Sequence, residues 1–203
     1  MSDFPDPRIL SIVPERDCER YADLSSTMQV LTVDSTAAKD VKQAIMPQIL
    51  EDAARKPDVF CWFGAIPAGE IEAWTERVAV HLPSDLLDFW RFTGGGDAFE
   101  SETILRPNVT SRPNAAFVVG DDTDSANNSH RASGMPEYLF LFGVGLFLSA
   151  VDLRTARYVT FSPRYSIRAE YASFEDWYLH TLRAEFGQRY GLEPIVQEPK
   201  TGL

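Results

Sequence analysis

The first residues that could carry out chemistry are the three histidines, His81, His130 and His180. None of them stands at a metal-binding spacing such as HExxH, so the sequence predicts no metal site. His130 follows Ser129, but a hydrolase needs a nucleophile, a base and an orienting acid that converge in space. The chain has no GxSxG motif, and sequence neighbours in a polar segment seldom hold such a geometry. A hydrolase that uses His130 is therefore the third alternative for the function.

The acidic segment from Gly120 to Gly134 suggests a second kind of chemistry, which is cation binding. Read from Asp121 or Asp122, the segment lacks the glycine and the terminal glutamate of a calcium-binding EF-hand loop. Its turn-forming residues instead predict a long exposed loop. The carboxylates of this loop, Asp124 among them, are then either a solvated turn or a docking patch for a basic partner.

Two glycine-rich stretches could in principle cradle phosphate, but their positions argue against it. Gly94-Gly95-Gly96 follows a predicted helix, and Gly143-Val144-Gly145 joins two predicted strands. Phosphate-binding loops precede the N-terminus of a helix instead. Neither stretch matches a P-loop or a dinucleotide fingerprint. We therefore interpret them as a helix stop and a hairpin turn, and expect no cofactor and no enzyme activity.

The composition favours a folded protein that acts on another protein. The chain has 203 residues, of which 44% are hydrophobic, and this is enough apolar surface for a sizeable core. Its 30 acidic and 19 basic residues give a formal net charge of -11. Phosphate backbones repel such a chain, so direct nucleic-acid binding is disfavoured. The same charge speeds encounter with a basic partner, although many cytosolic bacterial proteins are simply acidic.

The cysteines and the apolar runs indicate where the protein is located. Cys18 and Cys61 form no CxxC pair and no disulfide framework, which fits a reducing compartment. The first ten residues have no basic region followed by an apolar one, so we expect no signal peptide. The longest apolar run, at 138–150, is interrupted by glycine and is too short for a membrane helix. We therefore expect a cytoplasmic protein that makes no membrane contact.

The spacing of apolar residues predicts three helices in the first half of the chain, after an irregular segment at 1–35. These helices span about 36–55, 68–80 and 84–93, and a short apolar piece at 59–63 separates the first two. Pro47 lacks a backbone donor and should kink the first helix. Ser84 is expected to cap the third helix, which Gly94 should stop because glycine adopts the left-handed conformation without steric cost.

The second half of the chain is dominated by predicted strands. They span 102–106, 115–119, 138–142, 146–152 and 157–161. Residues 143–145 and 153–156 are the expected hairpin connections. Ser173 is expected to cap a last helix that buries its aromatic residues and ends near Gly187. Helices that cluster before and after a run of hairpin-connected strands indicate an α+β fold rather than alternating βαβ units.

Four pieces of the chain have the order and spacing of a known family. They are the helix EIEAWTERVAVHLP (70–83), the segment LPSDLLDFWRFTGGG (82–96), the strands YLFLFGVGLFLSAVDLRTARYV (138–159) and the helix SFEDWYLHTL (173–182). Together they resemble the SUKH superfamily, the Smi/Knr-type domains, over roughly residues 66–186. Thr93 departs from the asparagine that often precedes the glycines in the family.

The resemblance implies an α+β fold with a curved, largely antiparallel sheet flanked by N- and C-terminal helices. It divides the chain into an N-terminal extension with a helix that packs on the domain (1–65), a SUKH-like domain (66–190) and a tail (191–203). It carries over no catalytic residues. Many bacterial members look like immunity proteins that bind and neutralise a cognate toxin, often a nuclease. Other relatives act as regulators, so a regulatory or scaffold module is the second alternative.

A toxin-binding role predicts acidic side chains around a small apolar centre, facing a basic toxin domain. Trp62 is one candidate contact, because it lies on no helical stripe and is the aromatic residue expected to be exposed. The acidic candidates are Asp97, Glu100 and Glu102, which follow the glycine stop, and Asp121, Asp122 and Asp124 of the acidic segment.

Overall fold

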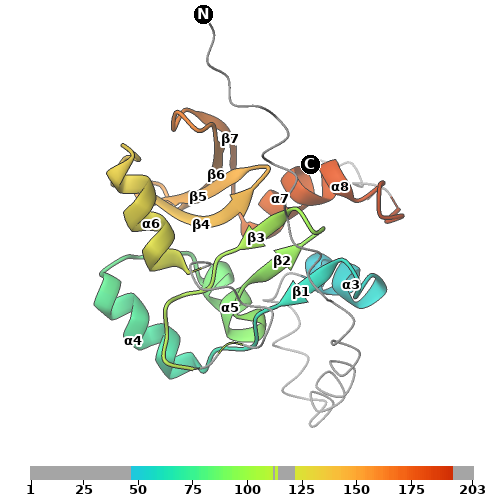
Figure 1. Ribbon diagram of the computed structural model, residues 1–203, viewed down its shortest axis with the longest axis horizontal. Helices are drawn as coiled ribbons and strands as arrows, with labels where there is room; N and C mark the ends of the chain where they lie inside the picture. The colour runs from blue at the N-terminus through green and yellow to red at the C-terminus, as the bar shows by residue number, and fades with distance from the viewer. Residues whose placement is uncertain (1–46, 112, 114–121, 194–203) are drawn as a thin grey trace, which may run out of the picture.

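A computed structural model describes residues 47–111, 113 and 122–193 of the chain. In these residues, seven strands form one antiparallel sheet, and each strand pairs with the next one along the chain. The strands are β1 (Phe60–Trp62), β2 (Gly96–Ala98), β3 (Glu102–Ile104), β4 (Leu139–Gly145), β5 (Leu148–Asp152), β6 (Arg157–Phe161) and β7 (Ile167–Tyr171). The predicted α+β class with an antiparallel sheet is therefore confirmed (Figure 1).

Seven helical elements accompany the sheet in the described residues. They are α3 (Pro47–Arg55), α4 (Ala68–Val78), α5 (Ser84–Thr93), α6 (Thr123–Ala132), α7 (Phe174–Trp177), the π-helix η3 (Tyr178–Arg183) and α8 (Ala184–Phe186). Helices α4 and α5 match the second and third predicted helices. The expected irregular segment 1–35, the part of the first predicted helix before Pro47 and the expected strand 115–119 lie outside the described residues.

The sheet buries apolar residues on both of its faces, because successive side chains of a strand point to opposite sides. Phe140 and Phe142 of β4 belong to the main core, where they pack with aromatic residues of the helices. Leu139 and Leu141 alternate with them and belong to a second cluster on the other face, which Met135 joins after α6. Figure 1 shows α6 beside β4. Strand β1 pairs with β2, so the part of the 1–65 extension that the structure describes contributes to the same sheet.

Local sequence determines where α5 ends, whereas contacts distant in sequence hold its start. Gly94 stops the helix as expected: its φ is 69° and its N–H donates to Trp90 O at 2.9 Å. The prediction that Ser84 is the N-cap was wrong, since Pro83 occupies that position and makes no side-chain cap. Asp85 instead accepts hydrogen bonds from Tyr158 Oη at 2.5 Å and Phe174 N at 2.8 Å. These two tertiary partners tie the start of the helix to β6 and α7.

The acidic segment is a helix and not the exposed loop that its turn-forming residues predicted. Asp122 caps α6 by accepting a hydrogen bond from Ser125 N at 2.8 Å. The residues that α6 buries are polar, Thr123 and Asn127, so the helix has no apolar stripe that sequence periodicity could detect. Asn127 is buried because its amide bonds to the backbone of β4.

The prediction that residues 143–145 form a hairpin turn was also wrong, because these residues belong to β4. Gly145 has a φ of 156°, and a Cβ there would lie 2.3 Å from Ser101 O, so glycine is required for the close approach of β3. The turn itself consists of Leu146 and Phe147, which connect β4 to β5. Strand β7 was not expected, although Ile167–Tyr171 alternates exposed and partly buried residues as a half-exposed strand does.

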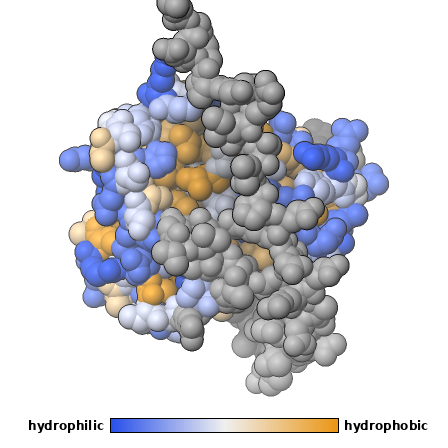
Figure 2. All heavy atoms as spheres, viewed as in Figure 1, coloured by the Kyte–Doolittle hydropathy of each residue, from blue (hydrophilic) through white to orange (hydrophobic). Residues whose placement is uncertain are grey.

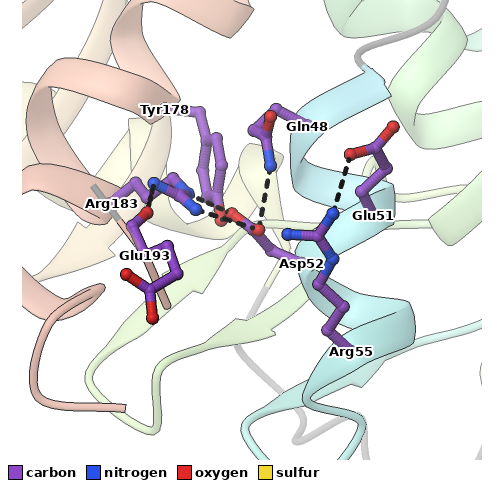
Figure 3. A network of polar contacts seen from close by, with 7 residues as sticks. All are labelled: Gln48, Glu51, Asp52, Arg55, Tyr178, Arg183 and Glu193. Carbon is purple, nitrogen blue, oxygen red and sulfur yellow. Dashed lines mark hydrogen bonds and ion pairs between the residues drawn. The ribbon is translucent and has the colours of Figure 1, made fainter. Parts of the chain in front are cut away.

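The closing helix begins as predicted and then changes its hydrogen bonding. Ser173 is its N-cap and accepts from Asp176 N at 3.0 Å, and the aromatic residues Phe174, Trp177 and Tyr178 are buried. Residues 178–183 then form a π-helix, in which hydrogen bonds span five residues. Tyr178 and Arg183, five residues apart, therefore both reach toward α3 (Figure 3).

Their common partner is Asp52 of α3, which is fully buried. Tyr178 Oη donates to its Oδ2 at 2.8 Å and Arg183 Nε to the same oxygen at 2.5 Å, while Gln48 donates to Oδ1 at 2.9 Å. Arg183 Nη1 also donates to the backbone oxygen of Glu193 at 2.9 Å. This network, drawn in Figure 3, joins α3 to the closing helix and to the last described residues.

Candidate functional site

Two turns lie side by side at one end of the interior strands β3 and β4. The turn Phe99–Ser101 connects β2 to β3, and the turn Leu146-Phe147 connects β4 to β5. Because β3 and β4 are antiparallel with Glu102 opposite Gly145, both turns are at the same end of these strands. We call residues 99–101 and 145–147 the two-turn edge. It combines an exposed apolar side chain with acidic ones.

Leu146 is the apolar part of the two-turn edge. Its exposed fraction is 63%, compared with 39% for Phe92, the next large hydrophobic residue exposed in the described part of the chain. Val144 and Leu148, on either side of the turn, are partly buried and pack on the second cluster. Figure 2 shows hydrophobic residues gathered on this face, over β4 and β5, with hydrophilic ones around them. An exposed apolar side chain on the tip of a hairpin is suited to insertion into a pocket of a partner.

Asp97 and Glu100 provide carboxylates on the neighbouring β2–β3 hairpin. Asp97 lies opposite Thr103, which in turn lies opposite Val144, so the three side chains share one sheet face. Asp97 Oδ1 accepts from Thr103 Oγ1 at 2.7 Å, which orients the carboxylate. Glu100 is exposed, and its Oε2 accepts from Tyr190 Oη at 3.2 Å. The two-turn edge therefore carries an exposed apolar side chain on one turn and an exposed carboxylate on the other.

The backbone of the β2–β3 turn is strained. Phe99 and Glu100 have φ values of 54° and 57°, and Ser101 N donates to Ala98 O across the turn. Two successive positive φ angles are typical of type I′ turns, which favour glycine and asparagine. Phe99 offsets the strain because its ring is fully buried among Phe60, Tyr178 and other rings of the core. Strained backbone of this kind concentrates at functional sites.

Glu102 lies beneath the edge and supports it from inside. Its exposed fraction is 2%, and its Oε1 accepts from Phe147 N at 2.9 Å. The second oxygen, Oε2, is buried and has no hydrogen-bond partner. Burial raises the pKa of Glu102 to about 7, against the opposing effect of the Phe147 and Leu146 amides. Glu102 thus holds the Leu146 turn but does not itself reach the surface.

The other acidic candidates lie elsewhere. Asp122 forms an isolated bridge with Arg106, beyond the opposite end of β3 from Glu102. Asp124 accepts from Trp74 Nε1 at 2.9 Å and pairs with Arg77 at 3.1 Å. Asp121 lies outside the described residues. The structure therefore places Asp97, Glu100 and Glu102 on one hairpin, with Asp97 and Glu102 on opposite faces of the sheet, and holds Asp122 and Asp124 elsewhere.

Trp62 is not the exposed aromatic residue that the sequence predicted. It is partly buried, and its ring packs edge-on against Phe89 with the centroids 5.6 Å apart. A Cβ on Gly96 would lie 2.6 Å from this ring, which shows how closely β2 approaches it. Sequence reasoning missed Leu146 instead. The sequence placed Leu146 inside the predicted strand 146–152, whereas the structure has it in the turn after Gly145.

The histidines do not form a catalytic arrangement within the described residues. The ring of His130 lies 3.4 Å from Tyr165 Oη through Nδ1, and its backbone oxygen accepts from the same hydroxyl at 3.1 Å. His180 stacks on Tyr171 with the ring centroids 6.4 Å apart. In the part of the chain that is described, no group of three or more His, Cys, Asp or Glu residues is placed to hold a metal ion.

A shallow pocket of about 220 Å³ lies between the end of α4 and α6. Val78, Val80 and Phe140 form its apolar wall, and Arg131 and Asn128 are among the polar residues of α6 that line it. Asp124 and Asn127 also line it, but both are already engaged with groups of the fold. The pocket therefore lacks the exposed apolar anchor that the two-turn edge presents.

The sequence matches no protein-family model and no curated protein. Within the described residues, no helix has both the length and the apolar character needed to cross a bilayer.

Proposed function

We propose that this chain is a protein-binding domain, an immunity protein that binds and neutralises a cognate toxin. The observation that carries the proposal is Leu146, 63% exposed on a hairpin tip whose neighbouring turn bears the exposed carboxylate of Glu100. An apolar anchor with charged neighbours is a common arrangement in interfaces, where a few central residues supply most of the binding energy. We infer a binding role and no enzymatic one.

The motifs that resemble SUKH domains support the proposal by their roles in the fold. The Leu-Pro step precedes α5, Gly94 stops it, and Ser173 caps the closing helix as that resemblance would require. The antiparallel sheet agrees with the same expectation. Fold alone does not decide function, so the toxin as partner rests on the family resemblance and on charge.

The mechanism that we propose is occlusion of a basic cleft. A toxin that acts on nucleic acid needs a basic surface, and a chain with a net charge of -11 is attracted to it over long range. Asp97 and Glu100 would meet the basic side chains of the toxin, while Leu146 would fill an apolar pocket beside them. We further propose that the complex forms in the cytoplasm, where the toxin would otherwise act.

The experiment starts from the genes next to this one. Any neighbouring toxin-like product is co-expressed with the chain, and binding is measured by calorimetry. Nanomolar affinity together with rescue of growth would support an immunity function. If no neighbour is toxin-like and none binds, the proposal is wrong, and a regulatory or scaffold module becomes the favoured alternative.

The docking surface is tested separately with a pair of variants. Leu146→Ala should lower the affinity for the toxin about tenfold or more, because truncation of a central apolar anchor costs about 1.4 kcal/mol or more of binding energy. Phe92→Ala, which truncates the other exposed large hydrophobic residue of the described chain, is the matched control and should change the affinity little. Equal affinities for the wild type and Leu146→Ala would remove the two-turn edge from the interface.

A further inference from the structure

The Leu146 turn rests on a buried carboxyl group whose hydrogen bonding is incomplete. Glu102 Oε1 accepts the N–H of Phe147 at 2.9 Å, while Oε2 is shielded from solvent and has no partner. A charged carboxylate that is buried with an unsatisfied oxygen is costly, and protonation would remove the charge and turn that oxygen into a donor. The turn therefore closes over a group that is more stable there when it carries a proton.

No compensating charge lies against this carboxyl group in the described residues. Strand β2 places Ala98 opposite Glu102, and β4 places Gly145 there. The nearest acid along the chain, Glu100, bonds to Tyr190 Oη on the exposed side of the β2–β3 turn. The elements packed around Glu102 thus bring backbone amides to it, and these lower its pKa less than burial raises it.

The backbone of β4 lies close against the carboxyl group. A Cβ at Gly145 would lie 2.7 Å from Glu102 Cδ and 2.8 Å from Oε2. Because β4 passes this close and Phe147 N bonds to Oε1, movement of the Gly145–Phe147 turn away from β3 would expose Glu102 to water. Ionisation of Glu102 and opening of the turn are therefore coupled.

We propose that Glu102 is a pH-sensitive latch of the two-turn edge: when it is protonated it holds the Leu146 turn closed, and when it ionises the turn opens to solvent. Leu146 is carried on this turn, so its presentation to a partner depends on the protonation of Glu102. The effect on binding rests on the proposed function, whereas the latch itself is a property of the isolated chain. Glu102 is a positioning residue in this scheme, since it acts through the turn and does not touch a partner.

The size of the effect follows from linkage. The pKa of Glu102 is about 7 in the closed turn and 4.5 for an exposed glutamate. A group that binds its proton more tightly in the closed state favours opening as the pH rises between these two values. Between pH 6 and pH 8 the equilibrium constant for opening should increase about tenfold.

The test is an NMR titration of the full chain from pH 5 to pH 9 without any partner. The amide signals of Leu146 and Phe147 should shift with a midpoint near 7, and their hydrogen-exchange protection, corrected for intrinsic pH dependence, should fall about tenfold between pH 6 and pH 8. In Glu102→Gln the amide oxygen still accepts from Phe147 and its nitrogen is a donor, so both transitions should disappear. Glu100→Gln, on the neighbouring turn, should keep both.

Wild-type signals of Leu146 and Phe147 that show no transition near pH 7, or transitions that persist in Glu102→Gln, would overturn the latch. If Glu102→Gln does not fold, the wild-type titration and the Glu100→Gln control still decide. A partner that never binds would count against the proposed function and leave the titration result intact. If a toxin does bind, its affinity should weaken from pH 6 to pH 8 in the wild type and stay constant in Glu102→Gln.

Discussion

Asn127 of α6 takes the place of a neighbouring strand for Leu141 of β4. Its Nδ2 donates to Leu141 O at 2.8 Å, and its Oδ1 accepts from Leu141 N at 2.8 Å. The same Nδ2 donates to Thr123 O of its own helix at 2.8 Å. Leu141 lies just before the register shift of β4, beyond the last residue that β3 pairs. One side chain thus satisfies two backbone groups that would otherwise be buried without partners.

This relationship predicts a large effect of Asn127→Ala on stability. The variant leaves the N–H and C=O of Leu141 unsatisfied, and each buried unsatisfied group costs about 1–3 kcal/mol. We expect the free energy of unfolding to fall by about 3 kcal/mol in urea denaturation. The adjacent Asn128 is exposed, so Asn128→Ala should change stability by less than about 0.5 kcal/mol. Similar losses in the two variants would contradict the strand-replacing role of Asn127.

The ion pair between Asp52 and Arg183 predicts a second stability effect. The side chains of both residues are almost completely buried, so Asp52→Ala leaves the guanidinium without its counter-charge and should cost about 3–5 kcal/mol. The matched control is Glu51→Ala, one residue earlier on α3, which breaks an exposed pair with Arg55. That change should cost less than about 1 kcal/mol. Thermal unfolding of the three proteins measures the difference, and a cost below about 1 kcal/mol for Asp52→Ala would show that the network contributes little.

The positive φ of Glu100 predicts that this residue lowers the stability of the turn, while its carboxylate favours binding of a basic partner. Both Glu100→Gly and Glu100→Ala remove the carboxylate, but only glycine adopts the left-handed conformation without steric cost. We expect Glu100→Gly to be about 1 kcal/mol more stable than Glu100→Ala in urea denaturation. Both variants should associate more slowly with a basic toxin than the wild type does. Equal stabilities would mean that the positive φ of Glu100 costs the fold nothing.

The pKa of Glu102 predicts how global stability changes with pH. The folded chain keeps the proton of Glu102 up to a pKa of about 7, whereas the unfolded chain releases it near 4.5. Between these values the unfolded state binds fewer protons, so the contribution of Glu102 is present below pH 4.5 and is lost as the pH rises through 7. The loss is at most about 3 kcal/mol.

Urea denaturation at pH 5 and at pH 8 measures this contribution as a difference between proteins. The stability of the wild type should decline more over this interval than that of Glu102→Gln, since the other ionisable groups are common to both. A parallel decline would show that the carboxyl group is solvated in the folded chain.

Where neighbours along the chain decide the conformation, the sequence by itself was sufficient. Gly94 ends α5 because the left-handed conformation is favourable for glycine in any context, and Ser173 begins the closing helix because its hydroxyl reaches Asp176 N three residues on. The antiparallel α+β class followed from the succession of helices and short strands. Asp97, Glu100 and Glu102 belong to one short hairpin, as their closeness along the chain requires.

The tertiary structure decided everything that depends on a partner distant in sequence. The acidic segment became α6 because Asn127 bonds to β4, and the N-terminus of α5 is held by Asp85 because Tyr158 and Phe174 reach it. Leu146 is exposed and Glu102 is buried because β3 and β4 pair with Glu102 opposite Gly145. Apolar side chains are on average buried and carboxylates exposed, but Leu146 and Glu102 show the opposite. The register between two strands, which local sequence does not encode, therefore determined the candidate site.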